Sequence, residues 1–189
     1  MRPNTPARHR LSEIAAIGIF SALAFVGGYL FIQVPNVEVF TAVVFLAGVI
    51  LGPRNGMWVG LIAQTLFSIL NPYGVSQFPL LAAQVLNRML VGVTGGLLQS
   101  ILELEKRFVK PSVVLAFVGL ILTWLYDLMA YLSIAFMSGY SLEQMKILFA
   151  TGLPFYLVHG FSNALIFALA VPVVITAVRR QYSFRRSTK

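Results

Sequence analysis

Polar and ionisable side chains interrupt an apolar stretch near the middle of the sequence. Residues 79–103, PLLAAQVLNRMLVGVTGGLLQSILE, are numerous enough to cross a membrane as a helix, yet they include Gln84, Asn87 and Arg88. On an insertion scale, an arginine at the centre of a spanning helix costs roughly 2.5 to 3.5 kcal/mol, so it needs an acid, a polar interior or a ligand. The chemistry predicted for this stretch is therefore a buried ion pair or the recognition of a polar molecule.

Three other apolar segments also carry polar residues at helical spacing. Side chains three, four or seven positions apart share one face of a helix. The three sets are Trp124, Asp127 and Tyr131; Tyr156, His159 and Asn163; and Gln64, Ser68 and Asn71. We therefore expect four helices to present polar faces to one another.

Patterns of catalytic and metal-binding residues were sought and are missing. The sequence contains no His-Glu-x-x-His, no Gly-x-Ser-x-Gly and no phosphate-binding glycine loop with lysine. It has no cysteine, and the second histidine occurs only at position 9. We predict no enzymatic activity, no metal and no cofactor. Active transport would need energy from another subunit.

The composition is that of an integral membrane protein. Of 189 residues, 58% are hydrophobic and 11% are charged, whereas charged residues approach a quarter of an ordinary soluble domain. The net charge of +8 does not indicate nucleic-acid binding, because the basic residues lie between and beyond the apolar segments.

The predicted fold is all-α, a compact bundle of six transmembrane helices in one membrane domain (residues 11–178). Pro35, the 52–56 turn and the uncharged 71–79 loop separate helices, and a short surface helix at 141–150 would begin with a Ser141–Gln144 capping box. Pro172 is expected to kink the last span. Basic tails cover residues 1–10 and 179–189. The expected spans are 11–32, 38–51, 57–70, 79–103, 112–137 and 154–178.

The distribution of basic residues predicts the orientation in the membrane. Six spans place both termini and two connections on one side, and Lys146 is the one basic loop residue on the other. By the positive-inside rule, both termini are cytoplasmic and the 71–79 loop faces outward. The basic residues on the cytoplasmic side are Arg2, Arg8, Arg10, Arg54, Lys106, Arg107, Lys110, Arg179, Arg180, Arg185, Arg186 and Lys189.

At a rise of about 1.5 Å per residue, Arg88 lies about 13 Å and Asp127 about 15 Å from the outer ends of their helices. Two interpretations follow. Arg88 and Asp127 could form a buried ion pair that fixes helix packing, or the polar layer could line an outward-facing pocket for a small molecule. The two are compatible if the pair forms one wall. The candidate binding residues are Gln64, Asn71, Tyr73, Gln84, Asn87, Arg88, Trp124, Asp127, Tyr131, Tyr156, His159 and Asn163.

Two stretches resemble a known family. These are VPNVEVFTAVVFLAGVILGPRNGMWVG at 34–60 and NPYGVSQFPLLAAQ at 71–84, the latter followed by a glycine-rich helix. With the size and the six spans, the chain resembles the substrate-binding S components of energy-coupling factor (ECF) vitamin transporters.

The resemblance implies a binding subunit that captures a vitamin or related micronutrient outside the cell. It also implies partners, namely a transmembrane coupling subunit and a pair of ATPase subunits. The family's first helix usually docks through an Ala-xxx-Ala surface. Here Ala15 is followed by Ile19, so Gly18 and Ala22 are the nearest match.

The substrate and two other functions stay open at this point. Arg88 would favour a carboxylate or phosphate, as in biotin, pantothenate, lipoate or a phosphorylated vitamin. If Asp127 neutralised it, riboflavin, pyridoxine, a thiamine precursor or a corrinoid would suit the pocket. The alternatives to a capture protein are a rod-shape type of structural scaffold and an independent proton-coupled carrier that uses Asp127 or His159.

Overall fold

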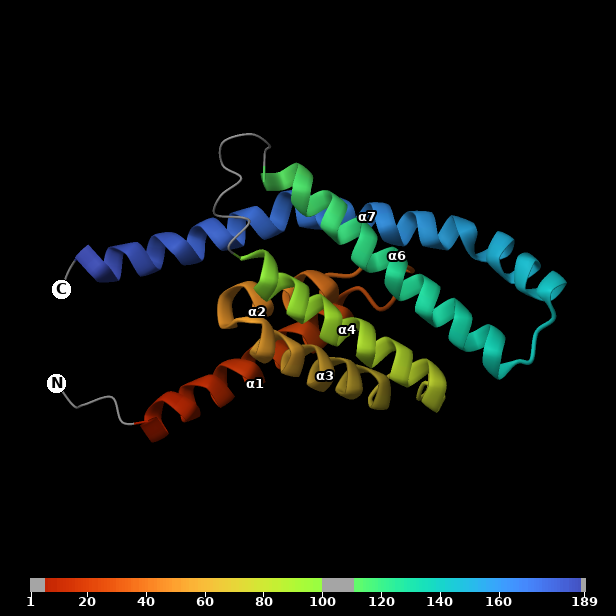
Figure 1. The fold of residues 1–189 in the computed structure, drawn as a ribbon, viewed down its shortest axis with the longest axis horizontal. Coiled ribbons are helices and arrows are strands. Elements are labelled where there is room, and N and C mark those ends of the chain that lie inside the picture. The colour runs from red at the N-terminus through yellow and green to blue at the C-terminus, as the bar shows by residue number, and fades with distance from the viewer. Residues whose placement is uncertain (1–5, 100–110, 188–189) are drawn as a thin grey trace.

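The structure, a computed structural model, describes residues 6–99 and 111–187 (Figure 1). These residues form helices and no strands, which confirms the predicted all-α fold class. The helices are α1 (Pro6–Leu30), α2 (Phe40–Leu51), α3 (Pro53–Ile69), α4 (Phe78–Leu98), α6 (Pro111–Met137) and α7 (Leu142–Ser187).

Within these ranges, four helical segments are long and apolar enough to cross a membrane: Arg10–Leu30, Phe78–Leu98, Ser112–Met137 and Leu142–Arg180. The apolar helix α2 has 12 residues. At about 1.5 Å per residue it is about 18 Å long, well short of a hydrocarbon core of roughly 30 Å. The structure therefore supports a membrane protein, and six complete crossings stay a prediction.

The start of α1 and the end of α7 lie at one end of the molecule, and the turn between α6 and α7 lies at the other (Figure 1). This arrangement agrees with termini on one side of a membrane. It does not test which side that is. Several residues behind that prediction lie outside the described residues: Arg2, Lys106, Arg107, Lys110 and Lys189, together with 100–103, the expected end of the fourth span.

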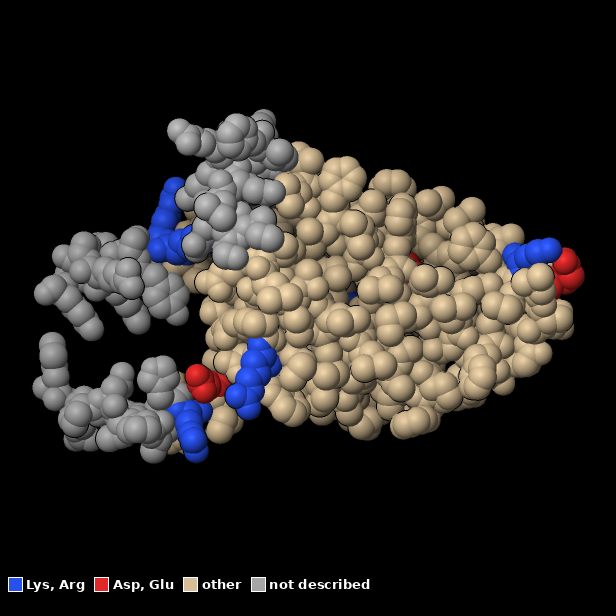
Figure 2. All heavy atoms as spheres, in the orientation of Figure 1, with Lys and Arg blue, Asp and Glu red and all other residues tan. Residues whose placement is uncertain are grey.

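Charged side chains gather at these same two ends (Figure 2). The surface between them is almost free of charge in this view, and large apolar side chains are exposed along it. On α7 they include Phe161, Leu165, Leu169 and Val173, each 60% to 66% exposed. An apolar surface of this extent would be unfavourable in water and suits contact with lipid tails.

The last helix differs from the prediction. We expected a separate surface helix at 141–150 and a new span from about residue 154, but α7 is continuous from Leu142 to Ser187 and includes both Pro154 and Pro172. Proline ends helices in water more readily than in a membrane protein, where neighbouring groups can satisfy the carbonyl that it leaves free. The Ser141–Gln144 capping box is confirmed, with Ser141 N–H donating to Gln144 Oε1 at 2.8 Å.

The predicted 52–56 turn is shorter than expected. Gly52 takes a positive φ of 89°, a conformation that glycine adopts without steric cost, and α3 begins directly afterwards at Pro53. The third helix thus starts four residues before the predicted position, because proline is well suited to the first helical position.

Glycines bring the backbones of α2, α3 and α4 into contact. A Cβ built on Gly92 would collide with the carbonyl of Gly56, and one built on Gly48 would collide with the carbonyl of Gly92. Gly95 and Gly96 likewise lie against the backbones of α2 and of the start of α3. Small residues allow this approach, and they make α2, α3 and α4 a tightly packed unit.

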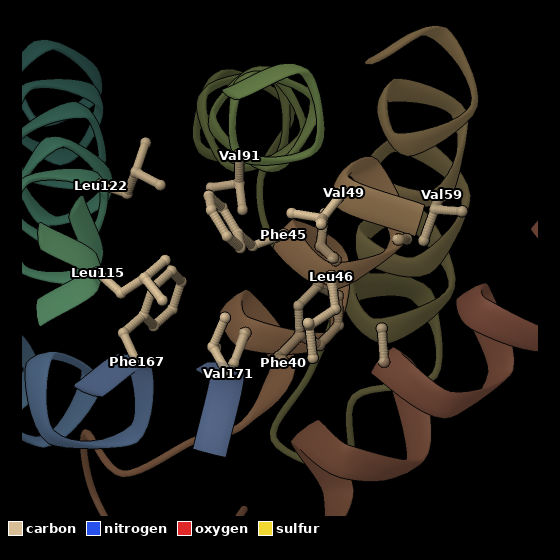
Figure 3. Close-up of a cluster of buried hydrophobic side chains, with 14 of the residues drawn as sticks. Phe40, Phe45, Leu46, Val49, Val59, Val91, Leu115, Leu122, Phe167 and Val171 are labelled. Atoms are coloured by element: carbon tan, nitrogen blue, oxygen red, sulfur yellow. The ribbon is translucent and has the colours of Figure 1, made fainter. Parts of the chain in front are cut away.

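A hairpin of α6 and α7 packs against this unit through an apolar core (Figure 3). Phe45 of α2 and Phe167 of α7 meet with ring centroids 5.1 Å apart. Val91 of α4 and Leu115 of α6 are buried in the same cluster. The core joins the hairpin to the other helices and so fixes the distance between the polar residues on each side.

Candidate functional site

Arg88 is buried on α4, with 5% of its surface exposed, and it contacts an acid and two polar side chains. Its Nη1 lies 3.6 Å from Glu38 Oε1, and its Nε donates to Gln64 Oε1 at 3.3 Å. Nη1 also donates to the Thr41 hydroxyl. The guanidinium lies over the ring of Tyr126, 4.5 Å from its centroid, in a cation–π contact.

The Arg88–Asp127 ion pair, one of the two interpretations of the polar layer, is wrong. Arg88 pairs with Glu38, which lies in the 31–39 loop just before α2, and Asp127 pairs with His159. Equal depth in the membrane does not bring two side chains together when they point in different directions around the bundle. Depth could be calculated from the sequence, whereas these directions depend on how the helices pack.

His159 connects the two acids. Its Nδ1 lies 2.7 Å from Asp127 Oδ1, and its Nε2 lies 3.7 Å from Glu38 Oε1. A protonated imidazole ring can donate a hydrogen bond from each of its two nitrogens. One carboxylate lies beside each nitrogen of His159, and this arrangement favours the protonated, positively charged ring, which we assign to His159. Arg88 and His159 then balance Glu38 and Asp127, and the four groups together carry no net charge.

Gln84 is the centre of a second polar network, which holds the 71–77 loop against α4. Its Oε1 accepts hydrogen bonds from Ser68 Oγ at 3.3 Å and from Ser76 Oγ at 3.1 Å. Gln64 Nε2 donates to Ser68 Oγ at 3.0 Å, so the predicted common face of Gln64 and Ser68 is confirmed. Gln84 thus holds the 71–77 loop in place, and it lines neither of the two cavities described below.

Asn87 and Asn163 are fully buried between helices. Asn87 Nδ2 donates to the Leu122 carbonyl at 3.4 Å, and Asn163 Nδ2 donates to Glu38 Oε1 at 3.2 Å. Within the part of the chain that the structure describes, Oδ1 of each residue has no hydrogen-bond partner, an unfavourable state for a buried acceptor. Each of these predicted binding residues contacts another helix or the 31–39 loop.

A cavity of about 270 Å³, here called the loop cavity, lies beside Arg88. Its walls come from the end of α1, the 31–39 loop, the 71–77 loop and parts of α2, α3, α4, α6 and α7. Phe31, Phe40, Phe67 and Tyr126 contribute aromatic surface, and Glu38 lies on the wall. The predicted binding residues that line it are Gln64, Asn71, Tyr73, Arg88 and His159.

A second cavity of about 310 Å³, the hairpin cavity, lies between α6 and α7 and is mostly apolar. Four more of the predicted binding residues line it: Trp124, Asp127, Tyr131 and Tyr156. The indole of Trp124 donates to the Tyr156 carbonyl at 3.1 Å, and Tyr131 Oη donates to the Met145 carbonyl at 2.9 Å. The single predicted pocket is therefore divided into two, with the Asp127–His159 pair between them.

Two residues that line the loop cavity, Glu38 and Tyr126, were not predicted, and neither was Thr41, which contacts Glu38 and Arg88. Glu38 is the only acid between residues 14 and 102, and that isolation was a signal that could have identified it as the partner of Arg88. Its Oε2 also accepts the Thr41 N–H at 2.8 Å, which caps the first turn of α2. We had assigned it only as the start of a span.

The 31–39 loop is fastened to α7 at the edge of the loop cavity. Ser162 Oγ donates to the Asn36 carbonyl at 2.8 Å. Asn36 adopts a φ of 60°, in the left-handed region that asparagine tolerates better than most residues. This hydrogen bond and the one from Asn163 Nδ2 to Glu38 hold the loop to α7, which is more than 120 residues away in sequence.

The predicted docking residues lie on an open face of α1. Ala15, Gly18 and Ala22 are exposed, and among residues 6–99 and 111–187 a Cβ built on Gly18 would meet no atom of another element within 4 Å. Among residues 6–99 and 111–187, no group of three or more His, Asp or Glu side chains is placed to hold a metal ion.

Comparison with known proteins identifies one family. The family model described as the ECF-type riboflavin transporter, S component, matches residues 9–179, which is most of the chain. No curated protein and no solved structure matches the chain significantly. The match agrees with the apolar helices and with the resemblance noted in the 34–60 and 71–84 stretches. The chain therefore belongs to the family of S components of ECF-type riboflavin transporters.

Proposed function

We propose that this protein is the membrane subunit that captures riboflavin outside the cell for an ECF-type importer. The observation that carries the proposal is the loop cavity, which adjoins a buried group of charges that balance one another. The matching family is described by the substrate riboflavin. The chain itself would bind and not catalyse.

The charge balance distinguishes between the two classes of substrate left open by the sequence. An unpaired Arg88 would favour a carboxylate or a phosphate, but Glu38 neutralises it. The cavity then offers aromatic faces and amide groups without net charge. Riboflavin fits this description, because it joins an uncharged planar ring system to a chain of hydroxyl groups.

The proposed topology has six spans with both termini in the cytoplasm, in the plasma membrane of a prokaryote. The charged ends and the uncharged surface between them support a transmembrane arrangement (Figure 2). Twelve of the basic residues fall on the terminal side by sequence. With this orientation the 31–39 and 71–77 loops, and hence the loop cavity, face the outside.

The proposed partners are a transmembrane coupling subunit and a pair of ATPase subunits, which would supply the energy for uptake. We propose the exposed face of α1 with Ala15, Gly18 and Ala22 as the docking surface for the coupling subunit. A helix face of small residues allows a second helix to approach closely.

Mass spectrometry of small molecules that co-purify with the protein tests the proposal. We expect riboflavin in the wild-type preparation and a strong loss of it in Arg88→Ala, because that change removes a wall of the cavity and leaves Glu38 buried without its partner. Arg54→Ala, a change at an exposed arginine, is the control and should retain riboflavin. A wild-type preparation that neither contains riboflavin nor is stabilised against heat by it would refute the proposal.

A further inference from the structure

The Glu38 carboxylate occupies the place in the loop cavity where hydrogen-bond donors converge. Arg88 Nη1 lies at 3.6 Å, His159 Nε2 at 3.7 Å and Asn163 Nδ2 at 3.2 Å, all from Oε1. The N–H and hydroxyl of Thr41 also donate to this carboxylate. These donors come from α2, α4 and α7, and together they form a site for an anion that a side chain of the protein already fills.

We propose that Glu38 determines specificity by excluding anionic ligands, such as the phosphorylated form of the vitamin, from the loop cavity. The carboxylate lies on the cavity wall with 15% of its side chain exposed. It uses the cationic donors that a phosphate would need and repels a second negative charge. Because the Glu38 side chain is mostly buried, this repulsion is screened less than it would be at the protein surface.

Glu38→Gln separates this role from a purely structural one. The amide has nearly the same size but carries no charge. Its one oxygen, at the position of Oε1, can still accept hydrogen bonds from Asn163 and the Thr41 hydroxyl, whereas its NH2 group cannot accept the hydrogen bond that Thr41 N–H gives to Oε2. Arg88 and His159 would then face the cavity with an excess of positive charge. A site built to bind a neutral molecule would become one that also binds anions.

The inference depends on the proposed function only for the identity of the neutral ligand. One arm of the experiment therefore compares riboflavin with riboflavin 5′-phosphate, and the other uses inorganic phosphate alone. If the wild-type protein fails to bind riboflavin, the proposed function is refuted, and the phosphate arm still decides the role of Glu38.

In the first arm, quenching of flavin fluorescence measures the Kd of each flavin for the purified full-length protein. For Glu38→Gln, we expect the ratio of the two Kd values to shift toward the phosphorylated flavin by at least about tenfold, as for one charge-assisted hydrogen bond. In the second arm, inorganic phosphate should raise the Tm of Glu38→Gln and leave that of the wild type unchanged.

Glu143→Gln is the matched control. It removes one carboxylate near the α6–α7 turn, where Glu143 is 77% exposed and pairs with Lys146 at 2.8 Å. The ratio of its two Kd values and the effect of phosphate on its Tm should both match those of the wild type. Equal shifts in the two variants would attribute the effect to total charge and overturn the inference, as would an unchanged ratio together with no effect of phosphate on Glu38→Gln.

If Glu38→Gln does not fold under ordinary conditions, its folded yield is the second measurement. Phosphate present during expression and purification should restore that yield by pairing with the uncompensated cations, whereas chloride at equal ionic strength should restore less. Equal yields in the two salts would count against the inference.

Discussion

At the scale of single residues, the loop cavity depends on charges that are favourable only together. Arg88, Glu38, His159 and Asp127 are each largely buried, with side chains between 6% and 15% exposed. A buried charge that loses its partner costs far more than an exposed one. This explains how an apolar helix can contain an arginine. It also means that Arg88 and Glu38 stabilise the protein only when both charges are present.

A double-mutant cycle on Arg88→Gln and Glu38→Gln tests whether the two charges depend on each other. Each single change should lower the free energy of unfolding by about 3 to 5 kcal/mol, because it leaves one buried charge unpaired. The double variant should be more stable than the sum of the two effects predicts, since it removes both charges. Unfolding in mixed detergent micelles measures the free energies.

The exposed pair of Glu143 and Lys146 provides the comparison for this cycle. The corresponding glutamine variants should show little coupling, since ion pairs at the surface contribute little. Coupling between Arg88 and Glu38 that is no larger than in this exposed pair would contradict the mutual dependence of the buried charges.

At the scale of helices, two glycines have opposite roles. Gly92 on α4 lies against the backbone of α3, while a Cβ built on Gly18 of α1 would have no neighbour within 4 Å in the described part of the chain. The first joins helices within the protein. The second leaves a helix face open, which is what a docking surface for another subunit requires.

Leucine at these two positions separates packing from docking. Gly18→Leu should fold and bind riboflavin like the wild type but lose uptake in cells that contain the whole transporter, because the bulky side chain blocks the α1 face. Gly92→Leu should lose the folded state itself, since its side chain would overlap the carbonyl of Gly56. Gel filtration, riboflavin binding and uptake of labelled riboflavin are the measurements.

Ala170→Leu places the same bulk at an exposed position on α7 and controls for a general effect on the membrane-facing surface. It should leave uptake unchanged. Normal uptake by Gly18→Leu would remove this face of α1 from the docking proposal, without affecting the proposal for the loop cavity.

At the scale of the whole molecule, the charges at the two ends determine the proposed orientation. Cysteine labelling tests it cleanly, because the natural sequence contains no cysteine. Val75→Cys, at an exposed position of the 71–77 loop, should react with a membrane-impermeant maleimide in intact cells. Arg54→Cys, in the predicted cytoplasmic turn, should react only after the cells are opened. The reverse pattern would invert the topology and place the loop cavity inside.

The sequence by itself determined the class of the protein and the identity of its polar residues. An apolar composition and helical spacing are local properties, so the all-α membrane fold and the common faces of Gln64 with Ser68 and of Asp127 with Tyr131 could be predicted. The resemblance of the 34–60 and 71–84 stretches correctly indicated the S-component family. The continuity of α7 through Pro154 was missed, because local rules give proline too much weight inside a membrane bundle.

Only the tertiary structure decided which of those residues meet. The rise along a helix gives the depth of Arg88 and Asp127, but the rotation of each helix about its axis comes from packing, here from the glycine contacts of α2, α3 and α4 and the Phe45–Phe167 core. That packing turns Arg88 toward Glu38 and Asp127 toward His159. It also divides one predicted pocket into two, because Tyr126 and Asp127 are neighbours in sequence and face different cavities.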